Sequence, residues 1–181
     1  HNRWLIHQTV IVKDVKEANA VALKILMAGV NSLEFKITSE TFTAEELDTL
    51  LNEISIKDIE LTFSGEKMAH VAELVLAKIE KEKLPADEIH LNFCIDPLVK
   101  NLTKKGAFCS PNGQTCFEKL AELIRKAKPY KHVRMVTVSG HIFSNSGSTI
   151  VEELAFALAA GHDYLVRLMD MGFSVDEAAK T

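Results

Sequence analysis

The sequence has few cysteines, and the three that it has, Cys94, Cys109 and Cys116, follow neither the spacing of a disulfide framework nor that of a zinc site. An odd number of cysteines without a framework is typical of a reducing compartment, so we expect free thiols and a cytoplasmic location. A signal peptide is not visible, and charged residues interrupt the apolar stretches well before the roughly 20 residues needed to cross a bilayer. We therefore expect no membrane partner.

The sequence also lacks a large excess of charge of one sign. The chain mixes 21 Lys and Arg residues with 25 Asp and Glu residues along its length, for a formal net charge of −4. Nothing in this pattern favours nucleic acid as a partner. The seven histidines do not show a two-ligand spacing such as H-E-x-x-H, so we expect no metal site. A length of 181 residues with 47% hydrophobic side chains predicts a single domain over residues 1–181.

What the sequence does contain is an alternation of short β-branched runs with amphipathic helical patterns. The expected strands are residues 4–12, 32–37, 59–63, 88–95 and 133–138, each followed by a helical pattern. Capping boxes that begin at Thr43, Thr149 and Ser174 mark three helix starts. Because a helix separates each strand from the next, the strands must be parallel and joined by right-handed crossovers.

Two architectures fit this alternation equally well. A doubly wound open sheet carries helices on both faces, whereas a (β/α)8 barrel carries them on one side and needs about 250 residues to close. Five units in 181 residues are too few for a closed barrel. The capping box at Ser174 opens a helix only a few residues before the last residue, which indicates a truncated chain.

Candidate chemistry lies where the expected strands end, because loops at the carboxyl ends of parallel strands gather at one edge. Asp96 follows the fourth strand in the position of a general base or metal ligand, although Asp before Pro is first of all a turn residue. His141 stands in a polar loop directly after the fifth strand, which is a common place for a catalytic histidine. The segment 145–149 could cradle an anion, but a plain capped turn is the commoner explanation.

Long stretches of the chain resemble the barrel domain of the methylmalonyl-CoA mutase family. The matching segments are residues 138–149, 153–159 and 174–179, with weaker matches at 4–8, 18–19, 29–33 and 95–98. The resemblance spans nearly the whole chain and implies a (β/α)8 barrel of the TIM type, incomplete here, with about five of its eight units. The D-x-H-x-x-G loop of the family's cobalamin-binding domain is absent, so we expect no such domain and no bound cofactor.

The sequence departs from the catalytic members where their chemistry lies. Those chains carry a Tyr-His pair directly after the Ser-Gly that follows the fifth strand, and here the two positions are His141 and Ile142. An isoleucine offers neither a hydrogen-bond donor nor an acceptor, so it cannot polarise a thioester carbonyl. The Gln and Glu just beyond are replaced by Ser144 and Asn145.

These departures resemble the non-catalytic small subunit of the heterodimeric enzyme. The resemblance implies an inactive accessory chain of an isomerase of propionate metabolism, which interconverts methylmalonyl-CoA and succinyl-CoA. Its partner would be the large catalytic subunit, which holds adenosylcobalamin.

Two alternatives stay open. In the first, His141 takes over the role of the lost histidine, and with Asn145 it binds an acyl-CoA or supports residual isomerase activity. In the second, the chain is an unrelated β/α-barrel lyase that uses Asp96. In every case the outer strands of an incomplete barrel would be open edges beside uncovered helix faces, so we also expect self-association.

Overall fold

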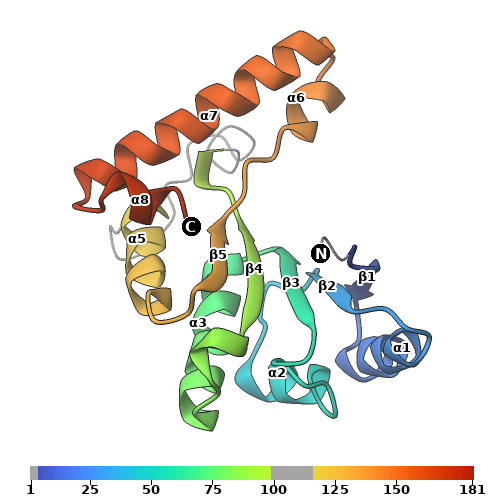
Figure 1. Ribbon diagram of the computed structural model, residues 1–181. Helices are drawn as coiled ribbons and strands as arrows, with labels where there is room; N and C mark the ends of the chain where they lie inside the picture. The colour runs from blue at the N-terminus through green and yellow to red at the C-terminus, as the bar shows by residue number, and fades with distance from the viewer. Residues whose placement is uncertain (1–3, 99–115) are drawn as a thin grey trace. The chain divides into compact units, whose positions relative to one another are not determined.

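The structure is a computed structural model that describes residues 4–98 and 116–181 (Figure 1). All five expected strands form, and a helix follows each of them. In chain order the elements are β1 (His7–Val12), α1 (Val15–Met27), β2 (Ser32–Ile37), α2 (Ala44–Leu50), β3 (Glu60–Gly65), α3 (Met68–Glu82), a 3₁₀ turn (Ala86–Glu88), β4 (His90–Ile95), α5 (Cys116–Ala127), β5 (His132–Val136), α6 (His141–Asn145), α7 (Ile150–Asp170) and α8 (Val175–Ala178).

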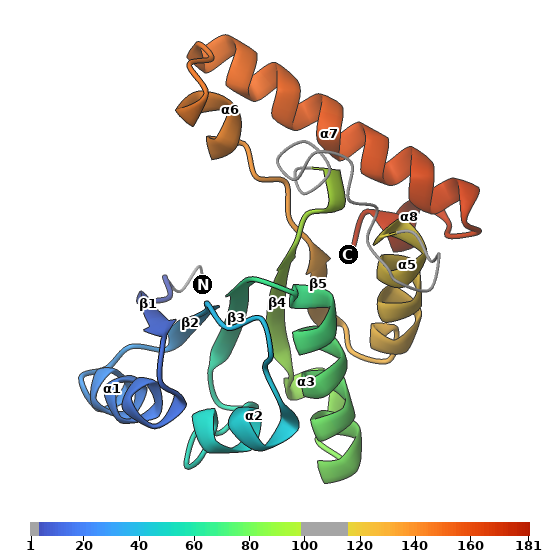
Figure 2. The ribbon, with the colours of Figure 1, turned by 180° about the vertical axis from the view of Figure 1, so that it is seen from behind.

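The five strands make one sheet in the order β1-β2-β3-β4-β5, and the pairings from β1 to β4 are parallel. A doubly wound sheet reverses its strand order at a switch point, and this sheet has no reversal. Right-handed crossovers that always step in the same direction place successive helices on the same face. Figure 2 shows α2 and α3 on one face of the strands. The order therefore favours the second of the two expected architectures, in which the helices lie on one side of the strands.

The contacts divide the chain into two compact units. The first unit comprises His1–Cys94 and Lys126–Arg134, and the second comprises Ile95–Arg125 and Met135–Thr181. Among the helices of the described residues, none is long and apolar enough to cross a membrane.

An aromatic row forms the core of the first unit. Phe35, Phe63 and Phe93 occupy the same level on three adjacent strands, with ring centroids 6.0 and 5.6 Å apart. All three side chains are at most 1% exposed. They are covered by the apolar stripe that the spacing of α3 predicts, and the buried members of that stripe are Met68, Val71, Ala72, Val75, Leu76 and Ile79.

The close approach of β3 to β2 requires a glycine at one point. Gly65 ends β3 with φ of 112°, and a Cβ there would lie 2.0 Å from the carbonyl oxygen of Ile37. Any other residue would both strain the backbone and push the two strand ends apart.

In the second unit, two arginines lie over aromatic rings. The Arg125 guanidinium lies 5.0 Å from the ring centroid of Phe173 and donates to the carbonyl oxygen of Met171. The Arg167 guanidinium lies 4.8 Å from the ring centroid of Phe117. Such stacked guanidinium groups hold α5 and α7 against each other and against the turn that follows α7.

The helix starts agree with the sequence. Thr43, Thr149 and Ser174 each accept from the third backbone N–H of their helix, while a glutamate reaches back to complete the box. Asp14 caps α1 by accepting from two backbone N–H groups. Each box satisfies two amides that a helix start otherwise leaves without partners.

Two local expectations were wrong. Residues 141–145, expected as a loop, form the short helix α6, and its Phe143 ring packs against Phe156 with centroids 5.2 Å apart. Cys116 is in a disulfide, contrary to the expected free thiol, whereas Cys94 carries none. A disulfide depends on spatial separation, which sequence spacing does not reveal. Cys109 lies outside the described residues, and the cytoplasmic location stays a prediction.

Candidate functional site

Asp96 lies directly after β4, at the end of the sheet where the sequence places candidate chemistry. Its two carboxylate oxygens accept hydrogen bonds from different parts of the second unit. The backbone N–H of Ser139 donates to Oδ2 at 2.8 Å, and the Tyr164 hydroxyl donates to Oδ1 at 2.6 Å. The same hydroxyl oxygen accepts from the backbone N–H of Leu98 at 3.1 Å. Asp96 thus joins the loop after β4, the loop after β5 and helix α7.

Tyr164 is the member of this group that the sequence did not predict. It is 3% exposed and lies in the middle of α7, inside an otherwise apolar pattern. Burial, followed by the hydrogen bond to Asp96, raises the pKa of its hydroxyl far above the ordinary value. The hydroxyl therefore stays protonated and donates to Asp96 at any physiological pH. Both oxygens of Asp96 serve protein donors, so the carboxylate is better explained as a structural tie than as a base.

The three positions named from the sequence lie together on α6. His141 and Asn145 are the first and last residues of this helix, and both are exposed. A spacing of four residues places their side chains on the same helical face. Ile142 is half-buried beside them and presents only hydrocarbon. The fold thus keeps an imidazole and an amide on one face of α6, and Ile142 adds no polar group beside them.

A second group of polar residues lies on the face of the sheet opposite the phenylalanine row. Glu34 on β2 accepts hydrogen bonds from the Thr9 hydroxyl at 2.6 Å and from the Ser64 hydroxyl. The Nε2 atom of His7 lies 3.7 Å from Oε2 of Glu34. Burial works to raise the pKa of Glu34, but hydrogen bonds from Ser64, Thr9 and His7 outweigh it and lower that pKa. Glu34 is therefore a carboxylate with donors on three sides.

The network continues along the first residues of the strands. His7 Nδ1 lies 2.8 Å from the Ser32 hydroxyl oxygen, and that hydroxyl donates to Glu60 at 3.1 Å. At the far side, the rings of His90 and His132 stack with centroids 4.4 Å apart. The signal for this face is the period-two pattern of β2, in which buried Leu33, Phe35 and Ile37 alternate with polar side chains. The sequence analysis used these residues only as a strand.

Residues 4–98 and 116–181 hold no group of three or more His, Cys, Asp or Glu side chains placed to bind a metal ion. The stacked histidines at the start of β4 and β5 lie near an ion pair between Lys131 and Asp87, whose charged atoms are 2.7 Å apart. Parallel stacking faces the two rings toward each other and does not direct their nitrogens to a common point.

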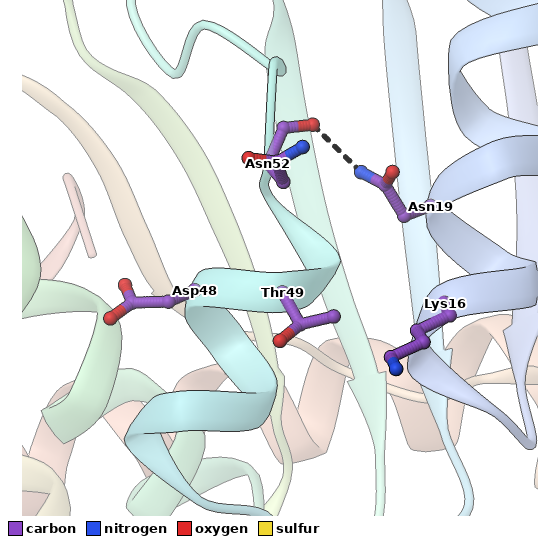
Figure 3. A pocket seen from close by; sticks show the side chains of 5 residues that line it. All are labelled: Lys16, Asn19, Asp48, Thr49 and Asn52. Atoms are coloured by element: carbon purple, nitrogen blue, oxygen red, sulfur yellow. Dashed lines mark hydrogen bonds between the residues drawn. The ribbon is translucent and has the colours of Figure 1, made fainter.

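A groove of about 410 Å³ lies between α1 and α2 (Figure 3). The residues that line it are Lys16, Asn19, Asp48, Thr49 and Asn52. The Asn19 amide crosses the groove and donates to the carbonyl oxygens of Leu50 and Asn52, at 2.9 and 2.8 Å. These carbonyls belong to the end of α2, where backbone acceptors need partners. The groove is therefore explained by the packing of two helices, and Asn19 has a structural role there.

Comparison with known proteins places these features in context. The family model described as methylmalonyl-CoA mutase matches residues 40–181. The methylmalonyl-CoA mutase small subunit of Porphyromonas gingivalis is 29% identical over 99% of this chain, and that of Propionibacterium freudenreichii subsp. shermanii is 30% identical over 93%. The small subunit of Streptomyces virginiae is 25% identical over 97%. The chain spans less than a third of the length of each relative, at 29%, 26% and 28%.

Proposed function

Because this chain belongs to the methylmalonyl-CoA mutase family, we propose that it is part of the accessory small subunit and does not itself catalyse the isomerisation of methylmalonyl-CoA and succinyl-CoA. The observation that carries the proposal is the composition of α6. A hydrocarbon side chain, Ile142, occupies the position after β5 where a carbonyl-binding imidazole stands in the catalytic chains that the sequence resembles. Polarising a thioester carbonyl requires a donor at that point.

The fold supports the proposal through its strand order. A sheet wound in one direction, with its phenylalanine row facing the helices, is what the first five units of a (β/α)8 barrel would form. The backbone N–H groups of Met135 and Val136 donate to the carbonyl oxygen of Thr181, at 3.3 and 3.4 Å. Thr181 thus lies beside β5 as a sixth strand would. We interpret residues 1–181 as one incomplete barrel domain.

The same proposal assigns the cofactor to the partner. Adenosylcobalamin supplies radical chemistry when it is bound, and we infer that this chain does not hold it. His7 and His70 already contact a hydroxyl and a carbonyl oxygen, and His90 stacks on His132. No segment carries D-x-H-x-x-G. The names of the relatives support a partner subunit, and we propose that this partner is the large catalytic subunit, in a heterodimer that this chain helps to stabilise.

Reconstitution tests the proposal. The large subunit is purified with and without the small subunit that contains this sequence, and the formation of succinyl-CoA is measured with added adenosylcobalamin. We expect activity only when the large subunit is present, and a higher thermal stability of that subunit when both are present. The double variant His141→Tyr, Ile142→His is the matched control for the chemistry of α6. Isomerisation by the small subunit alone would contradict the proposal.

A second candidate function has one observation in its favour, which is the shared helical face of His141 and Asn145. These two side chains could bind the polar part of an acyl-CoA without catalysing its isomerisation. Calorimetric titration with succinyl-CoA distinguishes the two functions. Micromolar binding that is lost in His141→Ala and Asn145→Ala would favour the binding function, whereas the accessory function predicts no measurable heat. A lyase that uses Asp96 has less support, because both oxygens of that carboxylate accept from protein donors.

A further inference from the structure

The chain that leads from β5 to α6 is held at its start by the loop after β4. The backbone N–H of Thr137 donates to the carbonyl oxygen of Ile95 at 3.2 Å, as in the ladder of two neighbouring strands. Two residues later, the backbone N–H of Ser139 donates at 2.8 Å to Oδ2 of Asp96, which directly follows Ile95. The Asp96 carboxylate thus becomes the acceptor at the point where the backbone ladder stops.

Tyr164 on α7 fixes the orientation of this carboxylate. Its hydroxyl donates to Oδ1 of Asp96 at 2.6 Å and accepts from the backbone N–H of Leu98 at 3.1 Å. The Tyr164 side chain is 3% exposed and packs against Phe117, with ring centroids 5.6 Å apart. A carboxylate that accepts on both oxygens cannot turn without losing a charge-assisted hydrogen bond. Tyr164 therefore acts on Ser139 through Asp96.

The hydrogen bonds of α6 carry this position forward into the helix. The backbone N–H of Ile142 donates to the carbonyl oxygen of Ser139 at 3.2 Å, and that of Phe143 donates to the carbonyl oxygen of Gly140 at 3.0 Å. Helix α6 has five residues and no side-chain cap at its start. A helix of this length has little stability of its own in water, so the contacts of its first turn decide whether it keeps its place.

Helix α7 supports the same segment along its length. Gly140 lies so close to α7 that a Cβ atom built on it would be 3.5 Å from the Cβ atom of Ala157. The Phe143 ring lies 5.2 Å from that of Phe156, measured between centroids. Figures 1 and 2 both show α6 beside the beginning of α7. Helix α7 therefore contacts this segment directly as well as through Asp96.

We propose that Tyr164 and Asp96 are positioning residues for α6, the helix that carries His141, Ile142 and Asn145. The inference deepens the proposed function, on which the interpretation of α6 as the counterpart of a carbonyl-binding helix rests. It adds that the chain keeps this helix in place through contacts that need no ligand, although the side chains on the helix differ. Both residues affect a ligand of α6 only through the helix, and neither is catalytic.

Amide hydrogen exchange of the purified chain, followed by NMR without a large subunit or a CoA ester, tests the proposal. Asp96→Ala is expected to speed the exchange of the hydrogen-bonded amides of residues 139–143 by at least about tenfold, because opening this segment no longer breaks a charge-assisted hydrogen bond. Tyr164→Phe, which keeps the ring, is expected to speed the same amides by at least about threefold. Because no large subunit or substrate is present, the result does not depend on the outcome of the reconstitution assay.

Two substitutions elsewhere are the matched controls. Asp170→Ala removes an exposed carboxylate from the end of α7, and Tyr130→Phe removes the hydroxyl of a half-exposed tyrosine. Both should leave the exchange of residues 139–143 within about twofold of wild type. Circular dichroism confirms that each variant is folded, and Tyr164→Phe decides the test if Asp96→Ala does not fold.

A purely stabilising role of Asp96 and Tyr164 gives a different pattern. It lowers the free energy of global unfolding but leaves the exchange of Ile142 and Phe143 unchanged, because α6 then opens without breaking the hydrogen bonds of the carboxylate. That pattern overturns the proposal, as does a Ser139 amide that exchanges faster by itself. Wild-type amides of α6 that exchange as fast as those of an unfolded peptide also overturn it, since the helix would then not be held in place.

Discussion

Helices α3 and α7 follow the same sequence rule and meet different surroundings. Both carry apolar residues at spacings of three and four. In α3 the stripe is buried, with Val71, Val75 and Ile79 at 0% exposure, whereas α7 buries only Tyr164 and Leu168. The periodicity of a helix therefore predicts that it forms and which face is apolar, but the neighbours of that face decide whether it becomes core.

A matched pair of leucine truncations is expected to show the largest difference in the free energy of unfolding. Leu76→Ala on α3 removes a side chain that is 6% exposed, and we expect a loss of about 2–5 kcal/mol because a cavity remains. Leu158→Ala on α7 removes one that is 65% exposed, and we expect a change within about 0.5 kcal/mol. Urea unfolding of both variants measures the difference. Equal losses would mean that the face of α7 that holds Leu158 is covered in solution.

The two tyrosines of the chain test whether the hydrogen bonds of Asp96 stabilise the second unit. Tyr164→Phe keeps the ring and removes the hydroxyl, which leaves Oδ1 of Asp96 and the N–H of Leu98 without this partner. We expect a loss of about 1–3 kcal/mol in the free energy of unfolding. Tyr130→Phe is the matched control, since Tyr130 is half-exposed and we expect nearly no change. A Tyr164→Phe variant as stable as wild type would show that the hydrogen bond from Tyr164 to Asp96 does not stabilise the fold.

The smallest effect concerns the polar face of the sheet. The folded-state pKa of Glu34 lies below its ordinary value of 4.5, so its charged form stabilises the fold above that pH. This contribution is lost as the pH falls from about 4.5 through the lowered pKa. We expect Glu34→Gln to lose stability less steeply than wild type in acid, as followed by thermal melts at several pH values. Glu40→Gln, at an exposed loop position, should keep the slope of wild type.

The strands, the helices and their capping boxes could be predicted from the sequence because local patterns determine them. Thr43, Thr149 and Ser174 cap the expected helices. Strand order could not be predicted, since periodicity carries no information on which strands are neighbours. Only the resemblance to a family favoured the singly wound order that the structure shows.

The candidate site was harder to predict, because its contacts join residues far apart in the chain. Asp96 was named from its position after a strand, but its donor Tyr164 lies 68 residues away and was not named from the sequence. Helix α6 packs its Phe143 ring against Phe156, a contact that no local signal reveals. The Glu34 network was missed because its members are spread over three strands and come together only through the register.

The most direct test of the account is the activity of the small subunit by itself. Purified protein that contains this sequence, supplied with methylmalonyl-CoA and adenosylcobalamin in the absence of the large subunit, is assayed for succinyl-CoA by mass spectrometry. The account predicts no product above the level without protein, because Ile142 offers no hydrogen bond to a thioester carbonyl. Succinyl-CoA that accumulates in proportion to the protein, and that disappears in His141→Ala, would contradict it.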